Sequence, residues 1–165
     1  MVEILQDFKP FFGIKQTGIP DVGALHYLQK LGVIDIGSNS VRMVVFDGAA
    51  RSPSYFYNER ILCELGLGLV NSGKLNPEGR LRAISAIEGF VNIAEAMEVP
   101  QLTLIATAAV RMASDGQTFC KEIAKKTKKE VKIINGLEEA RLSAQGVMLG
   151  WPLSLIHISE PTRPY

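Results

Sequence analysis

The residues best equipped for chemistry are the six from Asp35 to Ser40, with the sequence Asp-Ile-Gly-Ser-Asn-Ser. Gly37 lets the backbone approach a ligand closely. The three residues that follow it, Ser38, Asn39 and Ser40, add hydroxyl and amide donors, and successive N–H groups of such a turn can form a concavity that binds an anion. Asp35 ends the preceding apolar run, where a carboxylate can hold a hydrated divalent cation beside the same phosphate. The alternative is a plain hairpin turn whose polar side chains satisfy the backbone.

A second group of candidate residues comes with a later apolar run, Leu102–Thr107, which predicts a buried strand. Ligands of open α/β sheets bind beyond the carboxyl ends of parallel strands, so Arg111 is expected at a cleft, where its guanidinium can pair with phosphate. Thr107 is a weaker candidate for a phosphate-facing hydroxyl. For the arginine taken alone, a surface residue at the start of a helix is the more common alternative.

A third group follows the next predicted strand, in the sequence Asn135-Gly-Leu-Glu-Glu-Ala-Arg141. One of the acids Glu138 and Glu139 can act as a general base, because hydrolysis of a phosphoanhydride needs a positioned and partly deprotonated water. Both acids also suit the first turn of a helix, where they stabilise the helix dipole. Spacing alone does not choose between them, because adjacent helical residues face different directions.

Six lysines are concentrated in the segment between the second and third groups: Lys121, Lys125, Lys126, Lys128, Lys129 and Lys132. They suggest binding of a polyanion, but a solvated helix face and C-terminal turn is the more common reason for such a run.

These groups must be positioned by alternating strands and helices. Pro77, after the N-cap residue Asn76, predicts the start of a long helix that ends before Pro100. Its apolar stripe is expected to comprise Leu81, Ile84, Ile87, Val91, Ala94 and Met97.

The expected elements alternate between strands and helices along the chain. The first part is expected to contain a short helix near Asp21–Leu28, a hairpin of Val33–Ile36 and Val41–Phe46 followed by a turn at Asp47-Gly48, and a strand within Ser54–Leu62. After the long helix we expect the strand Leu102–Thr107, a helix from Ser114-Asp115, a strand Val131–Ile134 and a helix Glu138–Leu149. The order β-β-β-α-β-α-β-α predicts an α/β fold with a mixed sheet flanked by helices.

Composition places the chain among globular proteins. Its 165 residues are 47% hydrophobic and 21% charged, with a net charge of +1, which fits one domain and gives no general reason to expect DNA, RNA or membrane binding. The first 30 residues contain no continuous apolar segment of the kind found in a secretory signal. The two cysteines, Cys63 and Cys120, have neither spacing nor neighbours for a zinc site or disulfide framework, so we expect core thiols in a cytoplasmic protein.

The two ends of the chain differ in pattern from its body. Residues 1–30 predict an irregular leader. The stretch Leu153–Arg163 resembles the translation of a transposase-end adapter used in sequencing libraries, so residues 153–165 are expected to be a non-native tail. We therefore expect a lobe over residues 31–152 that is the front part of a longer protein.

Taken together, three motifs resemble the exopolyphosphatase/guanosine-pentaphosphate phosphatase family. They are the segment Asp35–Ser40 with its following strand, Thr107 with Arg111, and Asn135-Gly-Leu-Glu-Glu-Ala-Arg-Leu142. The resemblance covers about Gly32 to Pro152. It implies the actin-like ATPase (ribonuclease H-like) fold shared with sugar kinases and heat-shock chaperones.

The resemblance also implies roles for individual residues. Gly37–Ser40 matches the family's first phosphate loop, Arg111 the arginine that contacts the phosphate chain, and Glu139 the proposed base that activates water. Asp35 matches the acid on the magnesium side of the cleft, where it acts through water. The implied reaction releases terminal phosphate from inorganic polyphosphate, from guanosine pentaphosphate, or from both, with Mg²⁺.

One part of the family pattern is missing, namely a second phosphate loop of the form Asp-x-Gly-Gly-Gly-Ser, since the chain contains no Gly-Gly pair. We expect the chain to supply one wall of the cleft and to have little or no activity alone. The alternatives are an ATP-dependent kinase of the same superfamily and a non-catalytic module that binds nucleotide or polyphosphate. A homodimer of the full-length protein and the choice between the two substrates stay open.

Overall fold

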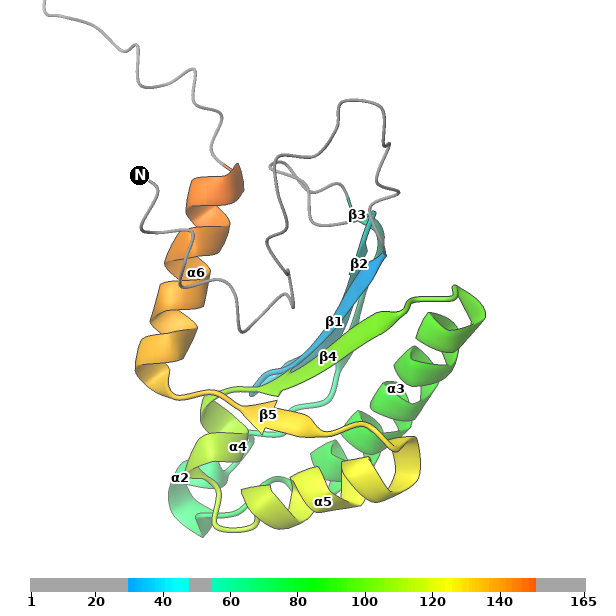
Figure 1. Ribbon diagram of the computed structural model, residues 1–165. Coiled ribbons are helices and arrows are strands. Elements are labelled where there is room, and N and C mark those ends of the chain that lie inside the picture. The colour runs from blue at the N-terminus through cyan, green and yellow to red at the C-terminus, as the bar shows by residue number, and fades with distance from the viewer. Residues whose placement is uncertain (1–29, 48–54, 151–165) are drawn as a thin grey trace, which may run out of the picture.

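The computed structural model of the protein describes residues 30–47 and 55–150 (Figure 1). The expected helix near Asp21–Leu28, the tail over residues 153–165 and the leader apart from Lys30 lie outside these residues, as does Gly48 of the turn expected after the hairpin.

The order of the long elements agrees with the prediction. The elements are β1 (Leu31–Ile36), β2 (Ser40–Phe46), β3 (Tyr55–Leu62), α2 (Leu69–Ser72), α3 (Pro77–Ala96), β4 (Gln101–Ala106), α4 (Ala108–Met112), α5 (Gly116–Thr127), β5 (Val131–Ile133) and α6 (Gly136–Gly150). The short helices α2 and α4 were not predicted. Arg111 consequently lies in the last turn of α4 rather than at the start of a helix.

The five strands form one mixed sheet in the order β3-β2-β1-β4-β5, which confirms the predicted fold class. Neighbours on the β3 side are antiparallel, whereas β1, β4 and β5 run parallel. Because these three strands are parallel, their carboxyl ends meet at one edge of the sheet, which is where ligands of such folds bind.

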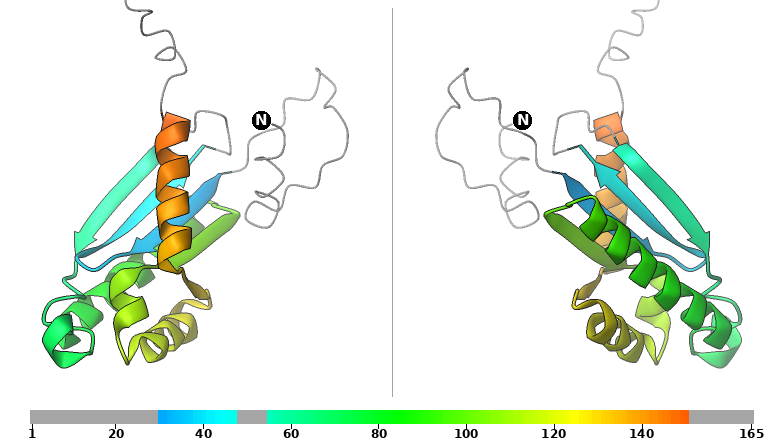
Figure 2. Two further views of the ribbon diagram at one scale, coloured as in Figure 1. Left: turned by 90° about the vertical axis from the view of Figure 1, so that its left-hand side faces the viewer. Right: turned by 90° about the vertical axis from the view of Figure 1, so that its right-hand side faces the viewer.

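Helices cover the two faces of the sheet unequally. Helix α3 contacts β1 and β2, α5 contacts β5, and the two helices contact each other. Helix α6 lies on the opposite face, as the two side views show (Figure 2). Since successive side chains of a strand point to opposite faces, Ile34 and Ile36 are fully buried towards α3 whereas Asp35 points to the face of α6.

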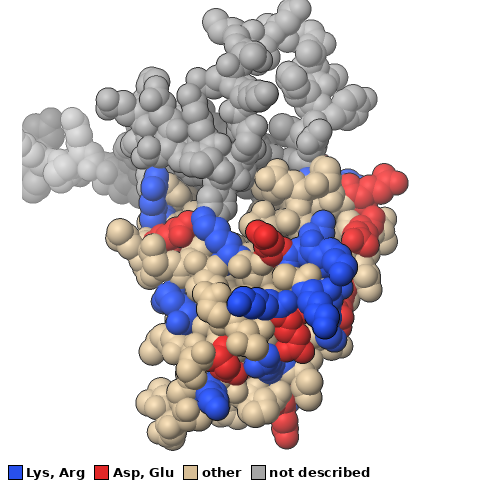
Figure 3. Space-filling view, turned by 60° about the horizontal axis from the view of Figure 1, so that its bottom comes forward, with Lys and Arg blue, Asp and Glu red and all other residues tan. Residues whose placement is uncertain are grey.

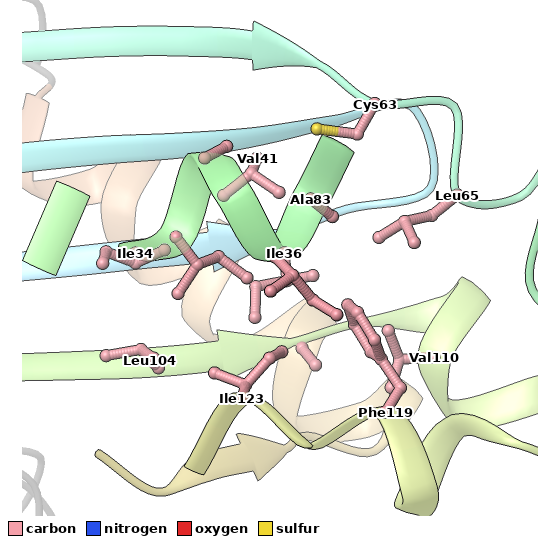
Figure 4. Packing of buried hydrophobic residues seen from close by; sticks show 14 of the residues in the cluster. Ile34, Ile36, Val41, Cys63, Leu65, Ala83, Leu104, Val110, Phe119 and Ile123 are labelled. Carbon is pink, nitrogen blue, oxygen red and sulfur yellow. The ribbon is translucent and has the colours of Figure 1, made fainter. Parts of the chain in front are cut away.

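The buried face supplies the hydrophobic core (Figure 4). Its largest fully buried side chains include Phe90 from α3 and Phe119 from α5, packed with residues of β1, β2 and β4. Cys63 and Cys120 are free and buried, which confirms the predicted core thiols. Burial raises the pKa of the Cys120 thiol to about 11.

Helix α3 starts where the sequence predicted, because the Asn76 side chain accepts a hydrogen bond from the Glu78 N–H at 3.3 Å and Pro77 occupies the first turn. Its predicted stripe was wrong at Leu81, which is 70% exposed. The buried face instead includes Ala83, Ala86 and Phe90. With 3.6 residues per turn, Leu81 lies about 120° around the helix from Ile87, so it points away from the sheet.

Among the described residues, no helix is both long and apolar enough to cross a lipid bilayer.

Candidate functional site

The polar turn between β1 and β2 comprises Gly37, Ser38 and Asn39, while Ser40 already belongs to β2. The Gly37 N–H donates to the Ser40 carbonyl at 3.0 Å and closes the turn. Ser38 and Asn39 are exposed, and their side chains make no hydrogen bond within the described part of the chain. The turn is therefore open to a ligand and retains donors for an anion.

A second loop, residues 63–66, braces this turn through backbone hydrogen bonds. The N–H groups of Cys63 and Glu64 both donate to the Asn39 carbonyl, at 2.9 and 2.8 Å, and the Gly66 N–H donates to the Ser38 carbonyl at 2.8 Å. This role was not predicted from the sequence. The residue that could have indicated this contact is Gly66, because an added Cβ there would lie 3.2 Å from the Ser38 Cβ.

Helix α3 in turn fixes the bracing loop, residues 63–66. The Arg82 guanidinium donates to the Cys63 carbonyl at 2.8 Å and to the Glu64 carboxylate at 3.1 Å. At Gly79 the helix comes so close that an added Cβ would lie 2.6 Å from the Cys63 carbonyl oxygen. The position of the polar turn is therefore set by backbone contacts that run from α3 through the bracing loop.

Ser40 and Thr107, predicted to bind phosphate, differ from the other turn residues. The Ser40 hydroxyl accepts a hydrogen bond from Arg60 Nε at 2.7 Å, so it has a partner on β3. Thr107 is half-buried between β4 and α4, and its N–H donates to the Ile36 carbonyl at 3.2 Å. This bond ties the start of α4 to the carboxyl end of β1, next to the polar turn.

Arg111 and Glu139 are paired at the carboxyl end of β5. Arg111 Nη1 donates to the Glu139 carboxylate at 3.2 Å and to the Ile134 carbonyl at 2.7 Å. Both side chains are partly exposed, 30% for Arg111 and 37% for Glu139. The remaining N–H groups of the guanidinium make no hydrogen bond within the described residues, so they stay available for an anion.

The two adjacent glutamates have different environments. Glu138 forms an ion pair with Lys132 at 2.7 Å, whereas Glu139 forms an ion pair with Arg111 and interacts electrostatically with Asp35. Asn135 caps α6, accepting from the Glu138 N–H at 2.8 Å, and so sets the rotation of the helix that separates the two carboxylates.

Asp35 is the one described side chain with a buried polar atom that lacks a hydrogen-bond partner, its Oδ1. Burial is the main reason that its pKa is raised, and the nearby Glu139 carboxylate raises it further, while Arg42, opposite it on β2, lowers it. Buried polar atoms normally find partners, so this orphaned oxygen indicates a place for a cation or a protonated group.

The residues present fit a hydrated magnesium ion. No group of three or more His, Cys, Asp or Glu side chains within residues 30–47 and 55–150 could hold a metal by itself. Mg²⁺ commonly keeps several waters and uses one or two carboxylates together with substrate phosphate. An orphaned carboxylate oxygen beside an exposed polar turn suits that mode.

The site is an open edge of the sheet. Two surface hollows of the described part lie elsewhere, one along β4 and β5 and one between α3 and β3. The structure thus brings together the polar turn, Asp35, Arg111 and Glu139 on one surface without enclosing them.

Comparison with known proteins agrees with this arrangement. Residues 44–154 match the Ppx/GppA phosphatase family. The chain belongs to this family. Among curated relatives, exopolyphosphatase 1 of Mycobacterium bovis and of Mycobacterium tuberculosis are each 31% identical over 125 residues, which cover 74% of this chain and 36% of theirs. The chain therefore spans little more than a third of the length of these relatives.

Solved structures of the family share the fold. An exopolyphosphatase from Cytophaga hutchinsonii is similar with a TM-score of 0.68 and 31% identity, covering 72% of this chain and 38% of that one. A Ppx/GppA family member from Aquifex aeolicus gives a TM-score of 0.67 at 22% identity, covering 73% of this chain and 40% of that one. These matches confirm the predicted family and the α/β fold of this lobe.

Proposed function

We propose that this chain supplies one wall of the catalytic cleft of a hydrolase that releases terminal phosphate from inorganic polyphosphate or guanosine pentaphosphate. The observation that carries the proposal is the convergence of Arg111, Glu139 and Asp35 beside an exposed polar turn at the carboxyl edge of the sheet. The names of the mycobacterial relatives support the same reaction class.

Phosphate is held by the turn and by Arg111. Exposed donors of Ser38 and Asn39 hydrogen-bond the phosphate oxygens, as N–H groups of such turns do for anions. The free N–H groups of Arg111 bind a second edge of the phosphate, since a guanidinium fork matches phosphate geometry. Its Nη1 bond to the Ile134 carbonyl keeps the guanidinium oriented.

Glu139 acts as the general base. In the described conformation Arg111 donates a hydrogen bond to its carboxylate at 3.2 Å. A bound phosphate competes for the guanidinium and leaves the Glu139 carboxylate free to take a proton from the attacking water. The water then adds to the terminal phosphorus as the bridging oxygen leaves.

Magnesium is the cofactor that suits Asp35. Its orphaned oxygen would hold the ion through water, and the ion supplies neutralisation of the phosphate charge that develops during transfer. A cation at this position would favour the ionised form of the Asp35 carboxylate despite its burial.

The 165-residue chain alone is proposed to have little or no activity. Phosphoryl transfer depends on donors and metal fixed around the phosphate, and the site described above is an open edge with donors from one side. As further proposals from the sequence, the protein is cytoplasmic and its full-length form is compatible with a homodimer.

The test uses a longer protein in which this chain is joined to the rest of its family sequence. We expect Glu139→Gln to lower magnesium-dependent phosphate release from polyphosphate by about 100-fold or more, with binding of tripolyphosphate retained. Glu138→Gln is the matched control and should leave the rate unchanged. Unchanged turnover in the Glu139→Gln variant would favour a non-catalytic binding module instead.

A further inference from the structure

The outer surface of α5 and the start of β5 form the most basic region of the described chain. We call it the lysine surface, and its members are Lys121, Lys125, Lys126, Lys128, Lys129 and Lys132. Residues 121–132 contain six lysines and two glutamates, whereas the whole chain has a net charge of only +1. Lysine and arginine side chains gather on the face that carries α5 (Figure 3). The rest of the chain is therefore net acidic, and positive charge is concentrated here.

The acidic groups of α5 do not neutralise these lysines. Asp115 and Glu122 are instead paired with Arg80 from α3, at 3.1 and 2.7 Å. Lys126 does pair with Glu88, at 3.4 Å. Within the described residues, Lys121, Lys125, Lys128 and Lys129 form no ion pair. Glu122 is thus paired with α3, whereas four of the six lysines have no ion pair within the described residues.

Helix stability explains only part of this pattern. The dipole favours cations in the last turn, which accounts for Lys125 and Lys126. It does not account for Lys121, one turn earlier, or for Lys129 beyond the helix. Like charges four residues apart repel and destabilise a helix, so the pair of Lys121 and Lys125 lowers the stability of α5. An interaction other than helix formation must offset this repulsion.

We propose that the lysine surface is a binding site for long-chain inorganic polyphosphate, separate from the polar turn at the catalytic edge. Lys121 and Lys125 lie one turn apart on the same face of α5, about 6 Å along its axis, and Lys128 follows as the C-cap residue of the helix. Their ammonium groups act as point charges for phosphate. Lys129 and Lys132 extend the row along a hollow of about 460 Å³ between β4 and β5.

The chemistry of the surface favours an inorganic polymer over other polyanions. Single-stranded nucleic acid is usually held by aromatic stacking in addition to charge, and residues 116–133 have Phe119 as their one aromatic residue, which is fully buried. Binding of a membrane surface by a helix usually uses exposed apolar side chains, and the exposed large apolar residues of the described part all lie outside this segment.

The position of the surface relative to the candidate site suits a polymer, an inference that rests on the proposed function. Lys132 lies within β5 and forms an ion pair with Glu138 at 2.7 Å, so the lysine surface reaches the start of α6, the helix that carries Glu139. A long polymer can therefore contact the lysine surface while its end lies at Glu139.

The experiment measures polyphosphate binding to the 165-residue chain by fluorescence anisotropy over a range of salt concentrations. The variant Lys121→Gln/Lys125→Gln/Lys128→Gln removes three exposed charges that form no ion pair with another described residue. We expect its affinity for long-chain polyphosphate to fall on the order of tenfold at low salt. The slope of log affinity against log salt should fall by about two to three, as for other phosphate polymers. Binding of tripolyphosphate should not change.

The matched control is Lys9→Gln/Lys15→Gln/Lys74→Gln, which has the same net charge and should bind long-chain polyphosphate like the parent chain. Thermal melting checks that each variant is folded. Equal affinities and salt slopes in the two triple variants would overturn the proposal. Patch-dependent binding of single-stranded RNA or phosphatidylserine vesicles, without binding of polyphosphate, would also overturn it. Because the readout is binding and not phosphate release, failure of the proposed catalytic function would leave this result intact.

Discussion

The two faces of the sheet differ in how far they are buried and in the side chains that they carry. The face under α3 and α5 is closed, with Ile34, Ile36 and Met43 fully buried. The face that carries α6 is half-open and holds Asp35, whose buried oxygen has no partner. Alternation along β1 places these contrasting environments one residue apart. The closed face supplies folding free energy, and the open face keeps the polar groups that chemistry needs.

The largest expected effect comes from the closed face. Ile87→Ala should lower the free energy of unfolding by about 2–5 kcal/mol, because it removes a fully buried side chain and leaves a cavity. Leu81→Ala on the same helix is the matched control and should change stability by about 0.5 kcal/mol or less, because Leu81 is exposed. Urea unfolding measures both, and equal losses would contradict the assignment of the buried face of α3.

A second pair of variants tests how α3 supports the polar turn. Gly79→Ala should destabilise the protein by about 1–3 kcal/mol, since the new methyl group meets the backbone of the bracing loop. Gly89→Ala in the same helix has open space and should stabilise it by about 0.5–1 kcal/mol. Gly79→Ala should also weaken phosphate binding at the turn, measured by calorimetry. If the variant binds phosphate as tightly as the parent chain, the polar turn does not depend on α3 for its position.

On the open face, Asp35→Asn should change the free energy of unfolding in the opposite direction and stabilise the protein at neutral pH. Burial and Glu139 raise the pKa of Asp35 above its ordinary value of 3.8, so the folded chain retains a proton at pH values where the unfolded chain has lost it. Stability is therefore lost as pH rises through this range. At pH 7 the variant should be more stable by about 1 kcal/mol.

The gain from Asp35→Asn should disappear as pH falls to 3.8 and below, where the carboxyl is protonated in both states. Thermal melting of both proteins across this range gives the difference directly. A variant that is less stable than the parent at pH 7 would show that the carboxylate has a stabilising partner.

The smallest expected effect is the coupling between Arg111 and Glu139. Both side chains are partly exposed, so a double-mutant cycle with Arg111→Gln and Glu139→Gln should give a coupling free energy of about 0.2–1 kcal/mol. The same substitutions should affect phosphate affinity of this chain, and turnover of the longer protein that contains it, far more than stability. A coupling free energy several times larger would show that the ion pair serves mainly to stabilise the fold.

Much of this fold was predictable because its signals are local. The hairpin of β1 and β2 follows from two apolar runs joined by a polar turn, and α3 follows from its capping residue and proline. The short helices α2 and α4 were not predictable from periodicity, since four or five residues complete barely one turn. Leu81 was misplaced because spacings of three and four fit more than one helix face.

The site was only partly predictable, because its decisive contacts are non-local. The sequence indicated the polar turn, Arg111 and the two acids, but not which acid pairs with the arginine. That choice depends on the rotation of α6, which Asn135 fixes. The bracing loop was missed because its hydrogen bonds join residues more than twenty positions apart. The assigned roles of the site residues stay predictions until the variants are measured.

The bracing loop has a practical consequence through Cys63. Its N–H supports the polar turn while its thiol is buried, and that burial raises its pKa. A thiol in this state reacts slowly with alkylating reagents unless the segment opens. In a Cys120→Ala background, Cys63 would be the single thiol of the chain. Its labelling rate would therefore report how often the loop beneath the polar turn opens, without any attached dye.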